Sequence, residues 1–96
     1  MRMFMRISIP IDKGNAAIKD GRIAKTLQEF GDRWHPEAMY FTATNGCRTA
    51  YAVVDLPKES DIPPMCEPLF LDLEAEIELG PAMNVEDLQV GLAALG

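Results

Sequence analysis

The segment Arg2–Ile9 has the alternation of a β-strand with two different faces. One face is apolar and the other is mixed: Met3, Met5, Ile7 and Ile9 alternate with Arg2, Phe4, Arg6 and Ser8. Pro10 is expected to end the strand, because it lacks the N–H that a continuing ladder would use.

From Asp12 to about Trp34 the apolar period becomes helical. The apolar stripe recurs at steps of four, three and four residues: Ile23, Leu27, Phe30 and Trp34. We expect Asp12 to cap the opening turn, and Asp20 with Gly21 to break or recap the helix midway. Pro36 ends it, because the residue before a proline avoids helical angles.

Two strand-like runs, Ala38–Ala43 and Cys47–Val54, lie on either side of Asn45-Gly46. Both central residues of a type I′ turn need positive φ, which asparagine and glycine tolerate. This is the strongest hairpin signal in the chain, so we predict two adjacent antiparallel strands.

The next pattern predicts a helix that Ser60 or Asp61 caps, with prolines in its first turn. Its apolar stripe has helical offsets: Ile62, Met65, Cys66, Leu69 and Phe70. Pro68 lies inside this helix and is expected to kink or shorten it.

The segment from Leu73 to Leu79 then alternates apolar residues with Glu74, Glu76 and Glu78, which predicts a last strand that stops at Gly80-Pro81. Asn84, with Asp87 three residues later, is typical of the start of a short terminal helix. The apolar residues of that helix are Val85, Leu88, Leu92 and Leu95.

The predicted order is therefore strand, helix, strand, strand, helix, strand and a short C-terminal helix. This is the split β-α-β arrangement of a ferredoxin-like α+β sandwich, in one domain over residues 1–96. Right-handed crossovers place the first and third strands at the centre of a four-stranded antiparallel sheet, with the last strand beside the first.

Two helices cover only one face of such a sheet. The other face would carry Phe4, with Tyr40 or Phe41 and Tyr51 or Val53, a patch larger than a monomer usually exposes. We therefore expect two copies to pair face to face as a dimeric α/β barrel.

Fifteen acidic and nine basic residues give a net charge of −6, which disfavours a nucleic-acid or an anionic-membrane partner. The charge is uneven, because residues 1–48 carry net +3 and residues 49–96 carry net −9. Two interpretations follow: the halves neutralise each other by packing together, or the first helix offers a basic surface to an acidic partner.

The two cysteines, Cys47 and Cys66, have no CxxC or CxxH spacing, so we expect no zinc or redox site. Arg2 and Arg6 interrupt the short apolar start and no cleavage site follows, which argues against a signal peptide. No segment has the length of a membrane-spanning helix. Together these features predict a cytoplasmic protein.

Several segments resemble signatures of a small uncharacterised bacterial family: Arg6–Pro10, Gly14–Gly21, Pro36–Thr42, Val53–Leu56 and Glu67–Leu71. The resemblance covers nearly the whole chain. It implies the dimeric α/β-barrel superfamily, whose members include cofactor-free monooxygenases, haem-degrading monooxygenases and lactone isomerases. It implies no substrate or catalytic residue, because a shared fold does not transfer an activity.

Three residues around the first helix have a functional and a structural interpretation. His35 could serve as a general base or haem ligand, or be solvated at a helix end. Trp34 could line a substrate pocket or close the helix stripe against the sheet. Asn15 could offer a ligand-contacting amide or act as a turn residue, and its small neighbour Gly14 leaves room beside it.

On the strands, Arg6 could bind an anion in a cleft or form cross-strand pairs with the glutamates of the last strand. Tyr40 and Tyr51 could present hydroxyls to the barrel interior or pack across the hairpin. A metal site on the strand glutamates is disfavoured, because no histidine accompanies them and arginines compete. We expect no metal and no cofactor.

Two classes of function stay open. The first is a homodimeric binding module whose inter-sheet or sheet–helix cleft holds a small apolar or aromatic ligand. The second is a cofactor-independent enzyme, monooxygenase-like or isomerase-like, that uses Arg6, Asn15, His35 and a tyrosine. The scarcity of titratable groups with an orienting partner favours the first class. A subunit role in a larger assembly is a third possibility.

Overall fold

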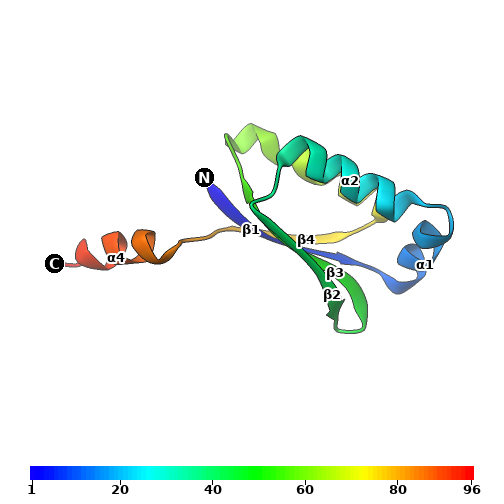
Figure 1. Cartoon of the computed structure of the whole chain (residues 1–96), viewed down its shortest axis with the longest axis horizontal. Helices are drawn as coiled ribbons and strands as arrows, with labels where there is room; N and C mark the ends of the chain where they lie inside the picture. Colours follow the sequence, from blue (N-terminus) through cyan, green and yellow to red (C-terminus); the bar gives the residue numbers. More distant parts are fainter.

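A computed structural model describes all residues, 1–96, as an α+β fold of two layers (Figure 1). The elements in chain order are β1 (Arg2–Ile9), α1 (Ile11–Lys19), α2 (Arg22–Trp34), β2 (Ala38–Thr44), β3 (Cys47–Asp55), the 3₁₀ turn η1 (Glu59–Asp61), α3 (Ile62–Leu73), β4 (Glu76–Pro81) and α4 (Val85–Ala93). Helices α2 and α3 lie side by side on one face of the sheet, and the other face, called here the open face, has no helix.

The four strands form one antiparallel sheet in the order β2-β3-β1-β4. The first and third strands occupy its centre, as the crossover argument predicts, and the arrangement is compatible with a ferredoxin-like fold. Met5 lies opposite Ala52 of β3 and Leu79 of β4, whereas its neighbour Phe4 lies opposite Val53 and Gly80. The alternation of β1 thus assigns Met5 to the helix face and Phe4 to the open face.

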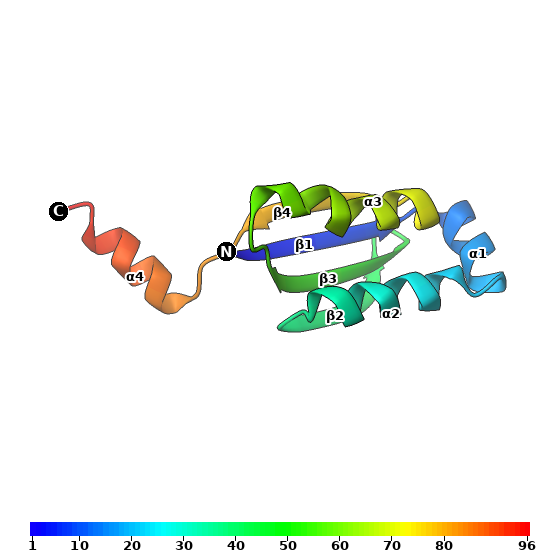
Figure 2. The same cartoon turned by 90° about the horizontal axis from the view of Figure 1, so that it is seen from above.

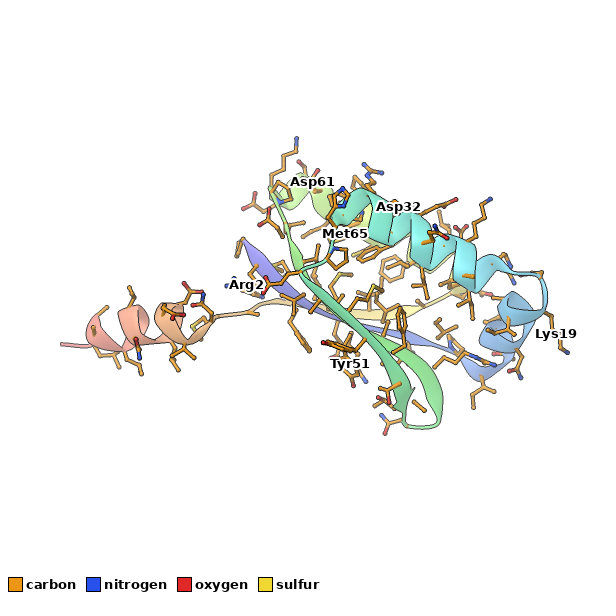
Figure 3. The ribbon with its side chains drawn as sticks, viewed as in Figure 1. Arg2, Lys19, Asp32, Tyr51, Asp61 and Met65 are labelled. Atoms are coloured by element: carbon orange, nitrogen blue, oxygen red, sulfur yellow. The ribbon has the colours of Figure 1, made fainter.

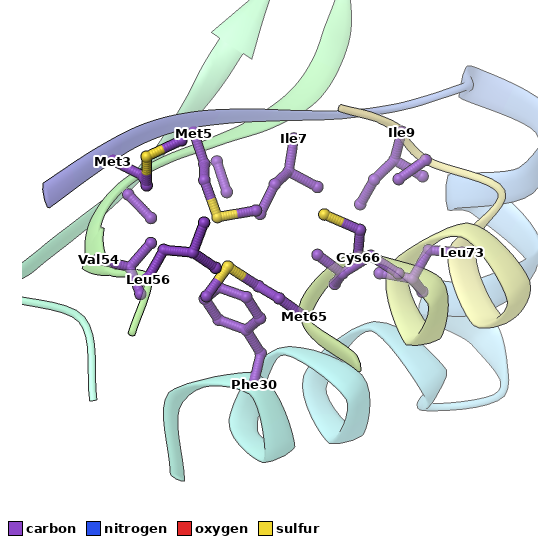
Figure 4. Close-up of a cluster of buried hydrophobic side chains, with 14 of the residues drawn as sticks. Met3, Met5, Ile7, Ile9, Phe30, Val54, Leu56, Met65, Cys66 and Leu73 are labelled. Carbon is purple, nitrogen blue, oxygen red and sulfur yellow. The ribbon is translucent and has the colours of Figure 1, made fainter. Parts of the chain in front are cut away.

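The hydrophobic core lies between the sheet and helices α2 and α3 (Figure 4). Its largest fully buried side chains are Met5, Ile7, Val54, Met65, Leu69 and Leu73. Every second residue of β1 enters this core, which confirms the period-two interpretation of Arg2–Ile9. Phe30 enters from the predicted stripe of α2, and its neighbours Ile23, Leu27 and Trp34 pack against the core from its edge.

The first helical stretch breaks where the sequence predicts, because Gly21 has φ 82° and only glycine takes such a value readily. The start is different from the prediction. The helix begins at Ile11, one residue before Asp12, and Asp12 makes no capping hydrogen bond. Pro10 stands at the cap position with φ −54°, and proline fixes this angle close to the helical value. Asp12 instead lies in the first turn, where a carboxylate suits the helix dipole.

Asp61, one of the two predicted caps, stands at the N-cap position of α3, but its side chain accepts no capping hydrogen bond, because η1 leads straight into the helix. Nor does Pro68 shorten α3, which runs unbroken to Leu73. An interior proline costs about 3 kcal/mol. Four buried side chains on the same helix, among them Leu69 and Leu73, offset that cost, since each contributes roughly 1.5–3 kcal/mol.

The last strand is shifted from the predicted segment. Leu73 closes α3, Glu74 follows at φ 50° as its C-cap, and β4 begins only at Glu76. The strand also continues through Gly80 to Pro81, which β4 tolerates because it lies at the sheet edge. Glu74 therefore leaves the predicted row of strand glutamates and pairs with Lys13 at 3.1 Å.

Several ion pairs join the basic first half of the chain to the acidic second half. Arg6 of β1 pairs with Glu78 of β4, and Arg2 pairs with Asp87 of α4. Lys13 of α1 pairs with Glu74, which follows α3. The uneven charge of the sequence is thus partly compensated within the chain.

Helix α4 stands away from the rest of the molecule, at one end of its 54 Å long axis (Figure 2). Its predicted start is confirmed: the Asn84 side chain accepts a hydrogen bond from Asp87 N, and the Asp87 carboxylate accepts from Asn84 N. None of its residues is buried.

Candidate functional site

An apolar pocket of about 220 Å³ lies between α2 and the sheet. Its walls come from four elements that the fold brings together. The apolar side chains are Ile7 and Ile9 of β1, Ile23 and Leu27 of α2, Phe41 of β2 and Ala50 of β3. Nearly all of its exposed lining is carbon. The transfer of an apolar molecule from water into a pocket of this composition is favourable. We call it the helix–sheet pocket.

A polar pair lies at the rim of the helix–sheet pocket. Arg48 of β3, which also lines the pocket, donates a hydrogen bond from Nη1 to Asn15 Oδ1 of α1 at 3.0 Å. Gly14 makes this approach possible, because a Cβ there would lie 2.8 Å from Arg48 Nη1 and 3.3 Å from Ile9. The space that the small neighbours of Asn15 leave is filled by the Arg48 side chain.

A second, wider hollow of about 410 Å³ lies on the open face. Phe4 and Tyr51 form its apolar wall with ring centroids 5.9 Å apart, and Gly80 leaves its floor without a side chain. Figure 3 shows Tyr51 on the side of the sheet away from α2. Arg6 and Glu78 close one side as an ion pair. We call this the open-face hollow.

The polar wall of the open-face hollow is already satisfied within the chain. Arg6 donates to both carboxylate oxygens of Glu78, from Nε at 3.2 Å and from Nη2 at 2.5 Å. This hydrogen bonding raises the pKa of the Arg6 guanidinium above its ordinary value. The cross-strand role of Arg6 is therefore the one its surroundings support, since its guanidinium is engaged with a carboxylate.

A third hollow of about 260 Å³ follows the groove between α2 and α3. Phe30 and Trp34 line one side, and Pro64 and Pro68 line the other. The Arg33 guanidinium lies 4.9 Å from the centre of the Trp34 ring, a cation–π distance. Trp34 is half-buried against the core, so it closes the stripe of α2 and also borders this groove.

The structure does not bring the five predicted site residues into one place. Asn15 accepts a hydrogen bond from Arg48, which lines the helix–sheet pocket, whereas Arg6 lies at the open-face hollow and Trp34 in the α2–α3 groove. His35 is exposed at the C-cap of α2, in a left-handed conformation with φ 46°. Tyr40 lies opposite Tyr51 in the sheet register and is 74% exposed.

Arg48 is the residue that the sequence argument missed. It follows the Asn45-Gly46 turn, and its partner in the sheet is Ile9, at the end of β1 where α1 begins. A signal was present in the sequence, because the hairpin turn and the two-residue period of β3 are readable there. Placing Arg48 beside Asn15 also needs the β1–β3 register, which no local pattern gives.

A scan against protein-family models and a search of curated proteins both found no match for this chain. None of the helices has the length and apolar composition needed to cross a bilayer. No three His, Cys, Asp or Glu side chains gather at a distance that would hold a metal ion.

Proposed function

We propose that the protein is a homodimeric module that binds a small apolar or aromatic molecule in the helix–sheet pocket. The carbon lining of this pocket, with Arg48 at its rim, is the observation that carries the proposal. A volume of about 220 Å³ suits a single substituted ring, because cavities near 150 Å³ bind benzene. Arg48 would donate to an acidic or carbonyl oxygen on that ring.

The expected affinity is modest. Burying about 150 Å² of an aromatic ring at about 25 cal/mol per Å² contributes on the order of 4 kcal/mol, a millimolar dissociation constant. A charge-assisted hydrogen bond adds about 1.5–3 kcal/mol, which strengthens binding roughly tenfold to a hundredfold. A ring with a carboxylate is therefore expected to bind more tightly than the same ring without one.

The dimer part of the proposal is supported by the open face. Phe4 is 46% exposed and Tyr40 is 74% exposed there, and no element of the same chain covers them. A second copy of the sheet would remove these rings from water. We also propose that the protein belongs to the dimeric α/β-barrel superfamily, which its sequence resembles and which implies the same pairing. The free thiols of Cys47 and Cys66 support a reducing, cytoplasmic setting.

Binding is tested by titrating methyl-labelled protein with benzoate and, separately, with toluene. We expect the methyl signals of Ile23 and Leu27 to shift with both probes, with benzoate at least tenfold tighter. Shifts confined to the open-face hollow, or no shifts at several millimolar, would refute the pocket assignment.

Three variants sharpen this test. Arg48→Leu should weaken benzoate to the level of toluene and leave toluene unchanged. Leu27→Phe fills the pocket and should weaken both probes, whereas Leu71→Phe, at a position 75% exposed on α3, should weaken neither. Far-ultraviolet circular dichroism of each variant checks that it folds. If Leu27→Phe and Leu71→Phe have the same effect, the ligand does not enter the pocket.

Native mass spectrometry of the freshly purified protein tests the dimer and any retained molecule together. A dimer with a reproducible added mass supports the whole proposal, and a monomer at micromolar concentration refutes the homodimer. The enzyme alternative is separated by returning the retained molecule to fresh protein and analysing it by chromatography and mass spectrometry, because a monooxygenase would change its mass and an isomerase would change its retention time. Binding is preferred because Arg6, Asn15 and His35 lie at three different places.

A further inference from the structure

Helix α4 carries an apolar stripe that nothing in its own chain covers. Val85, Leu88 and Leu92 repeat at steps of three and four residues, which places them along one side of the helix. Leu95, which the sequence pattern assigned to the same helix, lies in the turn after its end at Ala93. All four are exposed, from 43% for Leu88 to 83% for Leu95.

A helix of nine residues is marginal in water on its own, because nucleation is costly and few hydrogen bonds repay it. The reciprocal Asn84–Asp87 capping box stabilises its first turn but covers none of the stripe. Helices in proteins gain most of their stability from packing an apolar face. The stripe of α4 therefore requires a surface to pack on.

The chain ties the start of α4 to the open side of the sheet. Ala82 N donates to Arg2 O at 3.1 Å, and Arg2 Nη1 lies 3.4 Å from Asp87 Oδ2. Arg2 has the same parity along β1 as Phe4 and Arg6, so its side chain belongs to the open face. Figures 1 and 2 show that the rest of α4 continues away from its own sheet.

We propose that α4 of each chain packs over the β1–β4 side of the open face of a second copy, while the two sheets face each other over the rest, and that its leucines enter the partner's open-face hollow. The hollow is apolar where Phe4 and Tyr51 meet and lacks a side chain at Gly80, so a leucine fits there. The hollow is then complete only in the dimer, with one wall from each copy. This inference rests on the homodimer proposed above.

The area of the interface favours this arrangement. Strands of about eight residues in a four-stranded sheet give an open face of roughly 26 by 19 Å, a footprint of about 500 Å². A stable interface buries about 800 Å² on each partner. The footprint of α4, roughly 14 by 10 Å, brings each copy closer to that area.

The inference is tested by disulfide trapping between two differently labelled full-length chains, both with Cys47→Ser. One chain carries Gly80→Cys in the hollow, and the other carries Leu92→Cys on the stripe of α4 and is labelled with ¹⁵N. Mild oxidation of the mixture should give a covalent dimer with the mass of one labelled and one unlabelled chain. The control is Val90→Cys, which lies on the opposite side of α4 and should give at least tenfold less of this product.

The same substitutions in a single chain test the opposite geometry. If Gly80→Cys with Leu92→Cys forms a disulfide within one chain, α4 folds back on its own sheet and the inference is wrong. Absence of any trapped product, or equal trapping at Leu92 and Val90, also refutes it.

Sedimentation of the unmodified protein separates this inference from the homodimer itself. We expect Leu92→Asp to raise the dimer dissociation constant at least tenfold, and Val90→Asp to change it less than twofold. A wild-type protein that is monomeric refutes both proposals. A wild-type dimer that Leu92→Asp does not weaken refutes the α4 inference alone.

Discussion

Helix α3 offers two leucines of identical chemistry in opposite surroundings. Leu69 is fully buried in the core, whereas Leu71, two residues later on the same helix, is 75% exposed. Both Leu→Ala changes alter helix propensity by the same small amount. The difference between the two variants therefore measures the burial of the side chain and little else.

The expected loss at Leu69 follows from the carbon removed and the cavity left. About three methylene equivalents at ~0.8 kcal/mol each, with a cavity contribution, give a loss of about 3–4 kcal/mol for Leu69→Ala. Leu71→Ala is expected to cost less than about 0.5 kcal/mol. A domain of this length has a total stability of roughly 5–14 kcal/mol, so the first loss is a large part of it.

Urea unfolding followed by circular dichroism measures both values. With a slope of about 1.5 kcal/mol per molar urea, Leu69→Ala should lower the midpoint by roughly 2 M, and Leu71→Ala by less than about 0.4 M. All samples need the same protein concentration, because the proposed dimer would make apparent stability depend on concentration. Equal shifts, or a loss below about 1 kcal/mol for Leu69→Ala, would mean that α3 does not continue through Pro68 in the described orientation.

Three further predictions concern local groups. The backbone N–H of Arg22 lowers the pKa of Asp20, so an NMR titration should place that carboxyl below the ordinary value of about 3.9. The stability that this carboxylate contributes is present above the unfolded pKa and is lost as pH falls through the folded pKa; a midpoint above 4 would contradict this. Burial raises the pKa of the Cys66 thiol, so the native protein at pH 8 should show slow reaction with a disulfide reagent at Cys66 and full reaction only after unfolding. Asn84→Ala removes the capping box and should destabilise α4 by about 1 kcal/mol, seen as faster amide exchange in Val85–Ala93 but not in β1; unchanged exchange would argue against the cap.

Local patterns were sufficient where a local interaction decides the structure. The strand Arg2–Ile9, the break at Gly21 and the Asn45-Gly46 hairpin were predicted from period and turn chemistry, because each depends on backbone preferences within a few residues. The capping box of Asn84 is of the same kind. The strand order was then limited to a few choices by the handedness of crossovers.

Local patterns failed where packing outweighs propensity. Leu73 alternates with its neighbours as a strand residue would, but it ends α3, because there its side chain is buried beside Leu69. Proline normally breaks a helix, but α3 continues through Pro68 because packing of its buried face outweighs the cost.

In the candidate sites, too, local patterns identified some residues, and only the packing of distant segments identified their partners. Asn15 was selected from its small neighbours, but its partner Arg48 lies 33 residues away and was not. A cross-strand pair was one of two interpretations of Arg6, and its glutamate was identified among three only by the register of β1 and β4.

The sequence by itself determined the types of most elements, their order and the division of β1 into an apolar and a mixed face, since these follow from short-range periodicity and turn residues. Only the tertiary structure decided which distant residues meet: the carbon lining of the helix–sheet pocket, Arg48 over Gly14, and the exposed stripe of α4. The physical reason is that register and packing depend on the whole core at once, whereas backbone preferences act within a few residues.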